Sequence, residues 1–547
     1  MITNKKHKTN KRGNHSSSEV LNRGFLLSLL AVMSVLSATE ATAAPEGNAV
    51  PKVVVNILID QLRSDYMRAF MPLYGEDGFR RLLRDGRVYS QAEYPLVRPD
   101  RASAAATIAS GTSPANHGVI GRKWLDRNTL QSVFCVDDQM YPGTGGTLEK
   151  SSPINLAVST LGDELKVASE GKALVYSISP FRDAAILTAG HAADGAVWID
   201  SESGNWCSSS YYGELPTWAS VRNEHRGLSS FLKKNPWKPS SALVGNFSYF
   251  LSGGIKEPFY HRFKGDDRFA DFKTSGLVNG EVASAFADCL NGTSIGMDAI
   301  PDYVSVTLYA GNFEHRPISE SPMELQDTYV RLDNALAQMI KEVERRVGLD
   351  KALFVLTSTG YADVESADLS AYRIPEGTFD VERAAALLNM YLVAVYGQGI
   401  YVEACFGTQL YLNHNLIESK QINMSEILER SQDLLLQLSG VKDVYTSQRL
   451  MQGAWTPGIS RIRGGFNPRF SGDILIEVSP GWHYVSPRSG EKHLVRESYL
   501  PYPVIFLGYG IPAETVDTPV TVDYIAPTLS KAMRIRAPNA CSLAPLF

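Results

Sequence analysis

An aspartate stands where a buried strand is expected to end. Residues Val53 to Leu58 are almost all apolar and mostly β-branched, which is typical of a strand buried on both faces, and Asp60 follows directly. Open α/β sheets bind ligands outside the carboxyl ends of their strands, so we expect Asp60 to belong to a ligand site. Pro95 and Pro99 restrict the next loop, which leads into the small residues Ala102 to Ala109, able to pack closely on a sheet.

Four short motifs surround this aspartate. They are Asp60-Gln61, the Gly-Phe-x-x-Leu of 78–82, the Ser-Gly-Thr-Ser-Pro of 110–114 and the His-Gly-Val-Ile-Gly of 117–121. Together they resemble the alkaline phosphatase superfamily, in its bacterial branch of the nucleotide pyrophosphatase/phosphodiesterase type. Further similar segments occur at 155–165, 189–191, 302–308 and 503–510. The resemblance implies two zinc ions held by Asp and His, and a Thr or Ser at the start of a helix that attacks phosphorus.

The nucleophile position implied by the resemblance carries an arginine. In the family the nucleophile stands four residues before a His, a fixed step ahead of the Gly-Thr turn at Gly111. Counting back places Arg101 at the nucleophile and Ala105 at the His. Arginine has no hydroxyl and stays protonated in proteins. Ser103 lies two residues further on, but a helix turns about 200° over two residues, so its side chain would point elsewhere.

The first pair of zinc ligands is also replaced. The family places an Asp and a His four residues apart after the strand that starts near Asp302, and these positions carry Asn312 and Arg316. Asn has no charge to offset a dication, and Arg is always cationic. Glu314 and His315 lie between them and could act as substitutes, although without the other ligands we interpret them as an exposed loop pair.

The remaining zinc-ligand positions are also mostly replaced. The Asp-His pair expected after the next strand falls on Thr359 and Gly360, and the last His falls on Lys492, or on His493 with a shift of one residue. Of six ligands only Asp60 and, with that shift, His493 are kept. The sequence therefore predicts an incomplete set for two zinc ions, and we expect no cofactor.

Arginines accumulate around the same pocket. Arg122 stands at the family's phosphate-contacting Asn, and Arg182 stands where the Lys-x-Arg clamp of the phosphomonoesterases would fall. With Arg101 and Arg316 they could converge and hold an anion, because guanidinium groups match phosphate and carboxylate. The alternative is a structural network in which these arginines pair with Asp60, Asp183 and nearby carboxylates.

The rest of the chain alternates strands and helices. Strands are expected at 173–178, 195–199, 304–309, 353–357, 473–478 and 504–507, and helices at 156–167 and 325–347. This alternation favours an α/β fold with a mostly parallel central sheet and helices on both faces. The resemblance makes it an alkaline phosphatase-like three-layer sandwich over 45–547. Cap-like insertions are expected near 200–285 and 380–470.

The first residues predict export. A basic segment over 1–23 precedes an apolar run from Phe25 to Leu36 and an Ala-x-Ala site near Ala43 and Ala44, which is typical of a cleavable signal peptide over 1–44. The apolar run is shorter than the ~20 residues that a membrane span needs, so we expect no transmembrane span. The expected location is periplasmic or otherwise exported.

Charge and cysteine content exclude some functions. The formal net charge is −5, and the excess of positive charge lies in the predicted signal peptide, so nothing favours nucleic-acid binding. The five cysteines are widely spaced without a Cys-x-x-Cys, which excludes a zinc knuckle. One or two disulfides could form after export, but we expect several of the five to be buried as small hydrophobic residues.

Three functions remain open. The first is a non-catalytic binding or interaction protein, a degenerate member of its family, with an unknown protein partner or a small anionic ligand. The second is a divergent metal-dependent phosphatase or phosphodiesterase that uses Asp60, Ser103, Glu314, His315 and His493. The third is a structural component of the cell envelope that uses the aromatic-rich segment 203–250 as its contact surface.

Overall fold

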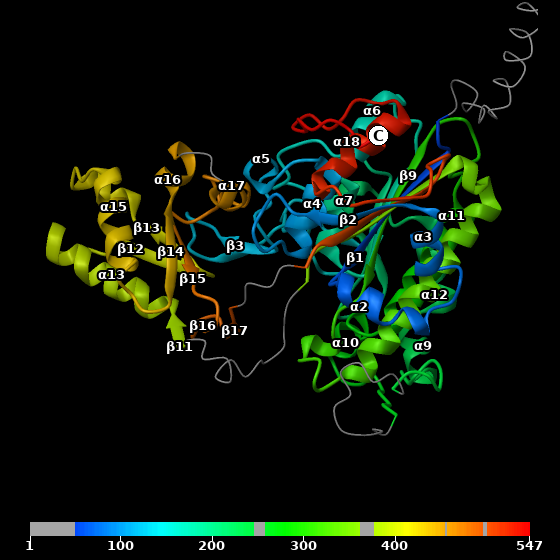
Figure 1. The fold of residues 1–547 in the computed structure, drawn as a ribbon, viewed down its shortest axis with the longest axis horizontal. Helices are drawn as coiled ribbons and strands as arrows, with labels where there is room; N and C mark the ends of the chain where they lie inside the picture. Colours follow the sequence, from blue (N-terminus) through cyan, green and yellow to red (C-terminus); the bar gives the residue numbers. More distant parts are fainter. Residues whose placement is uncertain (1–49, 246–257, 362–376, 454–456, 496–499) are drawn as a thin grey trace, which may run out of the picture. The chain divides into compact units, whose positions relative to one another are not determined.

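A large mixed sheet forms the centre of the protein (Figure 1). The computed structural model describes residues 50–245, 258–361, 377–453, 457–495 and 500–547. The strand order is β19-β2-β18-β10-β1-β9-β6-β7-β8-β5, with β20 beside β2. The bounds are β1 Val53–Asp60, β2 Arg87–Glu93, β5 Gly143–Thr144, β6 Val175–Ser179, β7 Gly195–Ile199, β8 Trp206–Ser209, β9 Asp302–Tyr309, β10 Ala352–Ser358, β18 Tyr502–Gly508, β19 Glu514–Val516 and β20 Val520–Thr521.

The middle of this sheet is parallel. Strands β10, β1, β9, β6 and β7 run in the same direction, whereas β18 is antiparallel to β10 and to β2. All eight residues of β1 and of β9 are buried, as their apolar sequences predict. In the register of the sheet Asp60 pairs with Tyr309, and Ile59 pairs with Ser358. The carboxyl ends of β1, β9 and β10 therefore meet at one edge.

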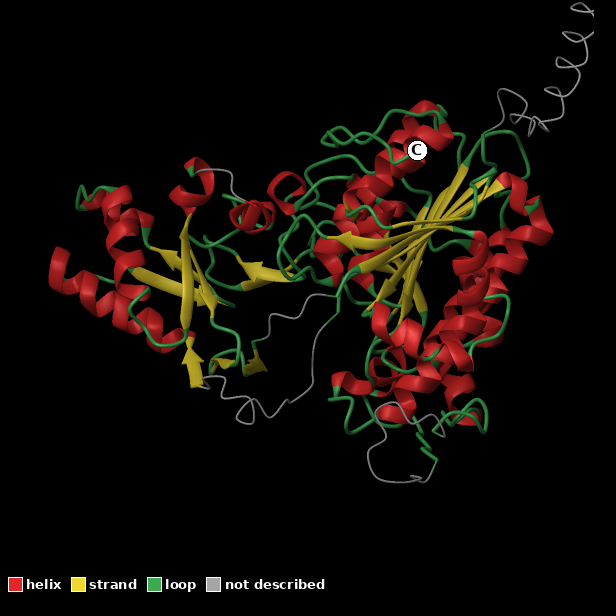
Figure 2. Cartoon of the chain, in the orientation of Figure 1, coloured by secondary structure: helices red, strands yellow, loops and turns green. Residues whose placement is uncertain are grey.

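Helices cover both faces of the sheet (Figures 1 and 2). Helices α3, α11 and α12 lie on one side, and α4, α6, α7 and α18 on the other. Their bounds are α3 Phe79–Asp85, α4 Arg101–Ser110, α6 Leu161–Ala168, α7 Arg182–Ala189, α11 Leu277–Gly292, α12 Pro322–Val347 and α18 Ile525–Met533. The predicted α/β class with a mostly parallel sheet between two helical layers is confirmed.

Shorter elements complete this part of the chain. Its other helices are α2 Ser64–Ala69, α5 Pro114–His117, α8 Thr217–Arg226, α9 Leu228–Lys234 and α10 Arg268–Lys273, with 3-10 turns η1 Met71–Leu73, η2 Ser210–Tyr212, η3 Phe313–His315, η4 Leu349–Lys351 and η6 Val522–Tyr524. A hairpin pairs β3 Lys123–Leu125 with β4 Ser132–Phe134. The described part of 203–250 is thus partly helical, and its Trp206 and Trp218 are buried together with Trp237. These three rings therefore contribute to the core, whereas Tyr211 and Tyr212 of the same segment are half-buried.

Residues 377–495 contain a second hydrophobic core, built around Leu388, Leu392, Leu410 and Ile476. Two small sheets occur there, in the orders β11-β16-β17 and β12-β13-β15-β14. The bounds are β11 Gly377–Asp380, α13 Val381–Tyr396, β12 Val402–Phe406, β13 Gln409–Leu412, α14 His414–Ser419, α15 Met424–Leu435, β14 Val441–Thr446, α16 Ser447–Gln452, α17 Pro457–Gly464, β15 Ile474–Val478, β16 Trp482–Ser486 and β17 Glu491–Leu494.

All five cysteines are free thiols. Cys135, Cys207 and Cys289 are buried, and Cys405 and Cys541 are half-buried, which agrees with their interpretation as small hydrophobic residues. Among the described helices none is both long and apolar enough to cross a membrane. The predicted signal peptide over 1–44 lies outside the described residues.

His191 ties the start of α6 to the loop after α7. Its Nδ1 lies 3.0 Å from Oδ2 of Asp163, and its Nε2 lies 3.0 Å from the carbonyl oxygen of Leu156. The Asp163 carboxylate and the Leu156 carbonyl both accept hydrogen bonds, so this geometry favours the imidazolium form, in which both ring nitrogens donate. The hydrogen bond to Asp163 is the main cause that raises the pKa of His191. Asp163 also forms a capping box with Thr160 at the start of α6.

This pair predicts a pH-dependent contribution to stability. Because the pKa of His191 is raised by folding, its contribution is complete below the unfolded pKa of about 6.5 and is lost as the pH rises through the folded value. We expect the unfolding free energy of the wild type to fall relative to His191→Gln as the pH rises from about 6.5 in denaturant titrations. His225→Gln, at an exposed position, serves as the matched control and should follow the wild type at every pH. A His191→Gln variant that also parallels the wild type would show that the imidazolium contributes nothing.

Candidate functional site

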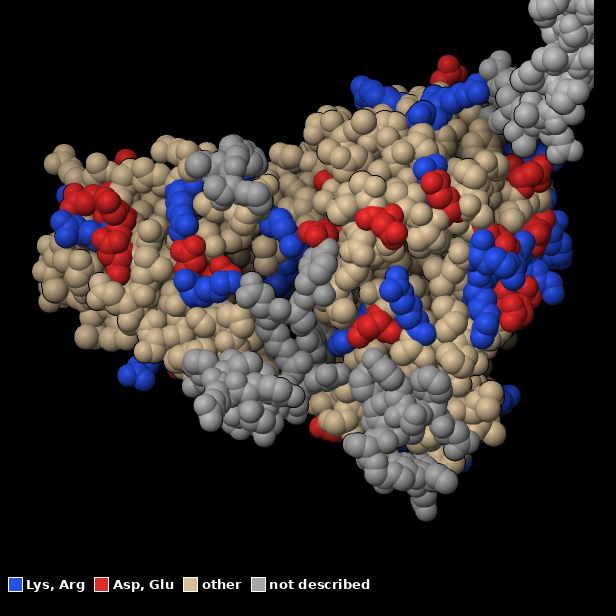
Figure 3. Space-filling model, viewed as in Figure 1, with Lys and Arg blue, Asp and Glu red and all other residues tan. Residues whose placement is uncertain are grey.

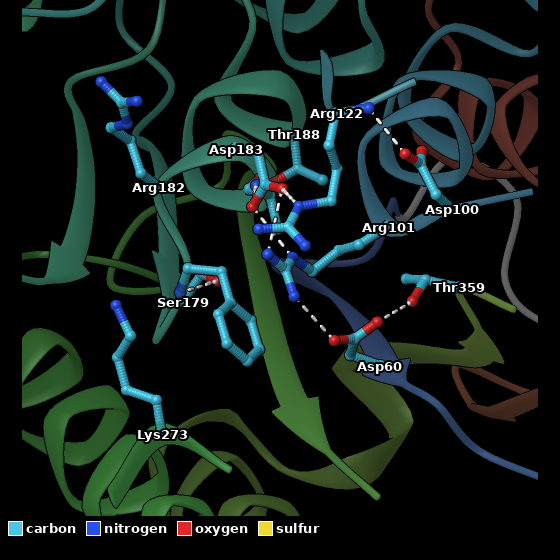
Figure 4. Close-up of polar contacts among 12 residues, drawn as sticks. Asp60, Asp100, Arg101, Arg122, Ser179, Arg182, Asp183, Thr188, Lys273 and Thr359 are labelled. Carbon is cyan, nitrogen blue, oxygen red and sulfur yellow. Dashed lines mark hydrogen bonds and ion pairs between the residues drawn. The ribbon is translucent and has the colours of Figure 1, made fainter. Parts of the chain in front are cut away.

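Arg101 bridges two buried carboxylates at the carboxyl edge of the sheet (Figure 4). Its Nη1 donates to Oδ2 of Asp60 at 2.9 Å, and its Nε and Nη2 donate to the two oxygens of Asp183 at 2.9 and 3.1 Å. The Arg101 side chain is 8% exposed and both carboxylates are 1% exposed. The predicted ion pair between Asp60 and Arg101 is confirmed, and Asp183 is a second partner.

The start of α4 positions this guanidinium. Asp100 caps the helix, because its Oδ1 accepts from the backbone N–H of Ser103 at 2.9 Å, and the Ser103 hydroxyl accepts in return from the N–H of Asp100 at 3.0 Å. Arg101 is the first residue of α4 and therefore projects from its amino end toward β1 and α7. Ser103 is buried and committed to the capping box, so the structure does not present it as a nucleophile.

The charges of this cluster depend on one another. Burial alone would raise the pKa of Asp183, but the guanidinium groups of Arg101 and Arg122 outweigh burial and lower this pKa to about 2. Burial alone would likewise lower the pKa of Arg101, yet the two carboxylates raise it above its ordinary value. The Arg101 guanidinium also lies over the ring of Phe181, 3.6 Å from its centroid. Both signs of charge are therefore held ionised inside the protein.

Arg122 joins the same cluster from its solvent side. Its Nε donates to Oδ2 of Asp183 at 3.1 Å, and its side chain is 48% exposed. Its backbone N–H donates to Oδ2 of Asp100 at 2.6 Å. Asp183 thus receives two guanidinium groups, and the terminal nitrogens of Arg122 have no hydrogen bond to any residue in the described part of the chain.

Arg182 does not join the cluster, which corrects the prediction that four arginines converge. It points away from Asp183 (Figure 4) and pairs with Asp137 at 2.9 Å and Glu149 at 3.4 Å. Because Arg182 and Asp183 are neighbours at the start of α7, they project in different directions. Lys273 lies on the other side of Phe181, where burial lowers its pKa to about 8, and its Nζ donates to Ser201 at 2.6 Å.

Thr359 completes the polar edge at the end of β10. Its hydroxyl donates to Oδ1 of Asp60 at 2.8 Å, so Asp60 accepts one hydrogen bond on each oxygen. Thr359 and Asp60 therefore lie on the same side of the sheet, as predicted. Gly360 has a φ of +99°, and a Cβ added to it would lie 2.8 Å from the carbonyl oxygen of Pro99. The backbone of β10 and the loop before α4 are thus in close contact there.

The loop after β9 does not present a ligand set. Asn312 donates to the carbonyl oxygen of Arg316, and Arg316 forms an ion pair with Glu314, so these side chains are used within the loop. Glu314 and His315 have φ values of 50° and 55°, which is the left-handed region that costs energy for residues other than glycine. Burial is the main cause that lowers the pKa of His315. Among the described residues Arg316 pairs with Glu314 and not with Asp60 or Asp183.

Within the described residues His493 has no hydrogen bond or ion pair with Asp60, Arg101 or Asp183. It lies on β17, paired with Tyr484 of β16, and its ring centroid is 5.0 Å from that of Tyr484. Its only ion-pair partner among the described residues is Glu491, at 3.4 Å. The expectation that His493 lines one cleft with Asp60 is not supported by these contacts.

Comparison with known proteins places this site in a family. A family model described as type I phosphodiesterase / nucleotide pyrophosphatase matches residues 54–500. The chain belongs to this family, within the alkaline phosphatase superfamily.

Its relatives match almost the whole chain. Alkaline phosphatase PafA of Elizabethkingia meningoseptica is 28% identical over 543 residues, covering 95% of this chain and 98% of that protein. Alkaline phosphatase PhoV of Synechococcus elongatus is 26% identical over 520 residues, covering 90% and 92%. The crystal structure of wild-type PafA superposes with a TM-score of 0.78 at 27% identity, covering 91% of this chain and 99% of PafA.

These relatives correct our expectation that no cofactor is involved. The family uses zinc, and zinc is therefore the cofactor that membership implies. The donor set at the Asp60 edge does not fit a two-zinc centre, because the carboxylates of Asp60 and Asp183 are already compensated by guanidinium groups. Within the described residues no three His, Cys, Asp or Glu side chains are grouped to hold a metal ion.

Three residues of this site were not predicted as site residues. Asp183 entered the sequence analysis only as a possible partner of the arginines, and Phe181 did not enter it. Lys273 lies in a segment without a recognisable motif. The one available signal was the Phe-Arg-Asp sequence at 181–183, where a carboxylate stands at the start of a helix.

The cluster predicts strong coupling between its charged groups. Arg101→Thr leaves Asp60 buried without its cation and Asp183 with Arg122 alone, and we expect a loss of about 3–5 kcal/mol in the free energy of unfolding. Asp60→Asn combined with Arg101→Thr should cost less than the sum of the two single substitutions, by ~0.5–3 kcal/mol. Thermal and denaturant unfolding of the two single variants and the double variant measures this. Strictly additive losses would contradict the direct contact.

Proposed function

We propose that this protein is an exported, non-catalytic member of its family that binds small anions at the exposed side of the Arg101–Asp183–Arg122 cluster. The observation that carries the proposal is the position of Arg101. The side chain that stands at the nucleophile position of the resemblance is a guanidinium locked between Asp60 and Asp183. The basic and apolar segments at 1–23 and 25–36 support export.

The chemistry of the available groups supports the loss of turnover. A guanidinium cannot attack phosphorus, because it carries no hydroxyl and is not deprotonated in proteins. The Ser103 side chain takes part in the capping box of α4, and the Thr359 hydroxyl donates a hydrogen bond to Asp60. The carboxylate beside the Thr359 hydroxyl is that of Asp60, which is held in an ion pair with Arg101, so Thr359 has no unengaged base beside it of the kind that covalent phosphoryl transfer requires.

The electrostatics of the edge support an anionic ligand. Arg122 keeps its terminal nitrogens available on the solvent side, and planar guanidinium groups bind phosphate and carboxylate through paired hydrogen bonds. The amino ends of α4 and α7, where Arg101 and Asp183 lie, add the positive ends of two helix dipoles. Asp60 and Asp183 offset the two arginines, so the cluster offers directed donors without a large excess of charge.

A divergent phosphatase or phosphodiesterase is the second candidate, because relatives that match nearly the whole chain are alkaline phosphatases. The contacts of the residues proposed for this candidate do not favour it. Of its proposed groups, Asp60 is paired with Arg101, Ser103 caps α4, Glu314 pairs with Arg316, and His493 packs on Tyr484.

Turnover assays distinguish the two candidates. We expect no hydrolysis of an aryl phosphate or an aryl phosphodiester above the buffer rate, with or without added Zn²⁺, because no activated nucleophile is present. Arg101→Thr should not create activity, since the remaining donor groups stay engaged. Hydrolysis by the wild type that a chelator removes and Asp60→Ala abolishes would establish the phosphatase instead.

Anion binding can be measured separately from turnover. We expect orthophosphate to bind in calorimetric titrations at low ionic strength. Arg122→Gln should weaken this binding about tenfold or more, because it removes a charge-assisted pair of hydrogen bonds. Arg226→Gln, at a side chain that is 60% exposed on α8, is the control and should leave binding unchanged. Equal binding of orthophosphate by both variants would show that Arg122 is not part of the anion site.

A further inference from the structure

A cavity of about 260 Å³ lies between the loop 137–154, the turn η2 and the residues that follow α7. The side chains that line it include Asp138, Tyr141, Ser152, Ile154, His191 and Tyr211. Pockets for drug-sized ligands have volumes of roughly 300–1,000 Å³, so this cavity suits a smaller molecule. Asp183 lies at the start of α7 and His191 beyond its end, and a helix of 8 residues is about 12 Å long, so the cavity is separate from the Arg101 cluster.

Two tyrosine rings form one wall of the cavity. Tyr141 and Tyr211 meet edge to face, with ring centroids 4.9 Å apart and an interplanar angle of 81°. Among the described residues neither hydroxyl has a hydrogen-bond partner. Tyr212 packs on Tyr211 with ring centroids 5.0 Å apart, and its own hydroxyl donates to the carbonyl oxygen of Gly190 at 2.7 Å, which holds the wall in place. The face of an aromatic ring is negative, so it attracts a cation.

Backbone hydrogen bonds fix the two segments that carry these rings. The N–H of Ser151 donates to the carbonyl oxygen of Tyr141 at 3.0 Å, and the N–H of Ser210 donates to that of Pro142 at 2.9 Å. The loop 137–154 and the turn η2 are therefore joined directly beside the cavity. Because the wall is formed without a ligand, a ligand that binds there has little ordering cost to overcome.

Asp138 brings a carboxylate without a cation to the same cavity. The residue is 7% exposed, and its oxygens accept from the N–H of Met140 at 3.0 Å and from the Ser152 hydroxyl at 2.5 Å. No Lys, Arg or His in the described part of the chain forms an ion pair with it. A carboxylate so far removed from water is costly unless a positive charge lies nearby. A cationic ligand would supply that charge.

His191 also lines the cavity, but its charge is already compensated. Its Nδ1 lies 3.0 Å from Asp163 and its Nε2 lies 3.0 Å from the Leu156 carbonyl oxygen, so the ring offers the cavity no free nitrogen. The Asp163 carboxylate offsets the charge of the imidazolium. The pair of His191 with Asp163 therefore adds no net charge beside Asp138.

The other charged groups nearby are acidic in sum. Arg182 is shared between Asp137 at 2.9 Å and Glu149 at 3.4 Å, so these three side chains together carry a net negative charge. Lys150 and Glu214 are exposed, have opposite signs and form no ion pair with any residue that the structure describes. With the carboxylate of Asp138 added, the surroundings of the cavity favour a cation over an anion.

We propose that this cavity binds a small organic cation, an alkylated ammonium group that lies against the faces of Tyr141 and Tyr211 and beside the carboxylate of Asp138. Aromatic cages recognise quaternary ammonium groups through cation–π attraction. Alkyl groups on the nitrogen would also contact Ile154, which is 62% exposed and lines the same cavity. The proposal is independent of the anion site, because none of these residues belongs to the Arg101 cluster.

Calorimetric titration with tetramethylammonium chloride tests the site, at an ionic strength held constant with sodium chloride. We expect the wild type to bind tetramethylammonium and not tert-butyl alcohol, which has a similar shape but no charge. Asp138→Asn should weaken binding about tenfold or more, because an amide fits the same two hydrogen-bond partners but carries no charge. Glu214→Gln is the matched control, since it removes an exposed carboxylate that does not line the cavity, and it should bind like the wild type.

Three results would overturn the proposal. They are a wild type that does not bind tetramethylammonium, equal binding of the two probes, and equal affinities of Asp138→Asn and Glu214→Gln for tetramethylammonium. Orthophosphate titrated into the same preparation shows separately whether the anion site exists, so the two proposals fail independently.

Alkylated ammonium groups occur both free in solution and on lipid headgroups. Sedimentation with phosphatidylcholine vesicles distinguishes these sources. Co-sedimentation of the wild type that Tyr211→Leu abolishes would identify the ligand as a lipid headgroup. Binding of tetramethylammonium without co-sedimentation would identify it as a free compound.

Two substitutions of Tyr211 test the aromatic wall itself. Tyr211→Phe keeps the ring and should bind tetramethylammonium like the wild type, whereas Tyr211→Leu removes the ring and should weaken binding about threefold or more. Circular dichroism melts would show that both variants are folded. A Tyr211→Leu variant that binds as tightly as Tyr211→Phe would overturn the cation–π contact.

Discussion

The interaction on which the site depends is the ion pair of Arg101 with Asp60 and Asp183. It links the end of β1 to the amino ends of α4 and α7, three segments far apart in the sequence. All three groups are almost fully buried, so each would be costly to leave without its partners. Removing charge from any member leaves an uncompensated ion, and this constraint explains why the surrounding polar groups, Thr359 and Arg122, also direct hydrogen bonds toward the two carboxylates.

Membership of the family does not by itself determine the chemistry of the Arg101 site. The chain shares its fold with alkaline phosphatases over nearly its whole length. In that fold, carboxylates gather at the carboxyl edge of a parallel sheet, where a cation must compensate them. In this chain the guanidinium groups of Arg101 and Arg122 donate to the carboxylates of Asp60 and Asp183 at that edge. Function therefore has to be argued from Arg101 and its neighbours and not from the fold.

Residues 377–495 add a second core with its own surface chemistry. The inner side of α13 is buried as that of any amphipathic helix would be, but Leu387 and Met390 on its outer side are exposed. An isolated core does not need such a face, because exposed apolar side chains contribute nothing to its packing. The features that folding leaves unexplained therefore lie outside the Arg101 cluster as well as within it.

The sequence by itself determined the sheet and the identity of its central charged pair. The strands predicted at 195–199, 304–309 and 353–357 form because their continuous apolar runs can be stable only when both faces are buried. The pairing of Asp60 with Arg101 followed from the same logic, since a carboxylate at a buried strand end needs a cation and the next loop supplies one.

Only the tertiary structure decided where the other side chains point. Arg182 and Asp183 are adjacent in the chain, but successive residues of a helix project about 100° apart, so one enters the cluster and the other contacts Asp137. His493 could be counted onto a ligand position, yet the pairing of β17 with β16 sets its ring against Tyr484. Spacing along the chain determines which elements form, whereas the direction of each side chain depends on the packing of elements that are distant in sequence.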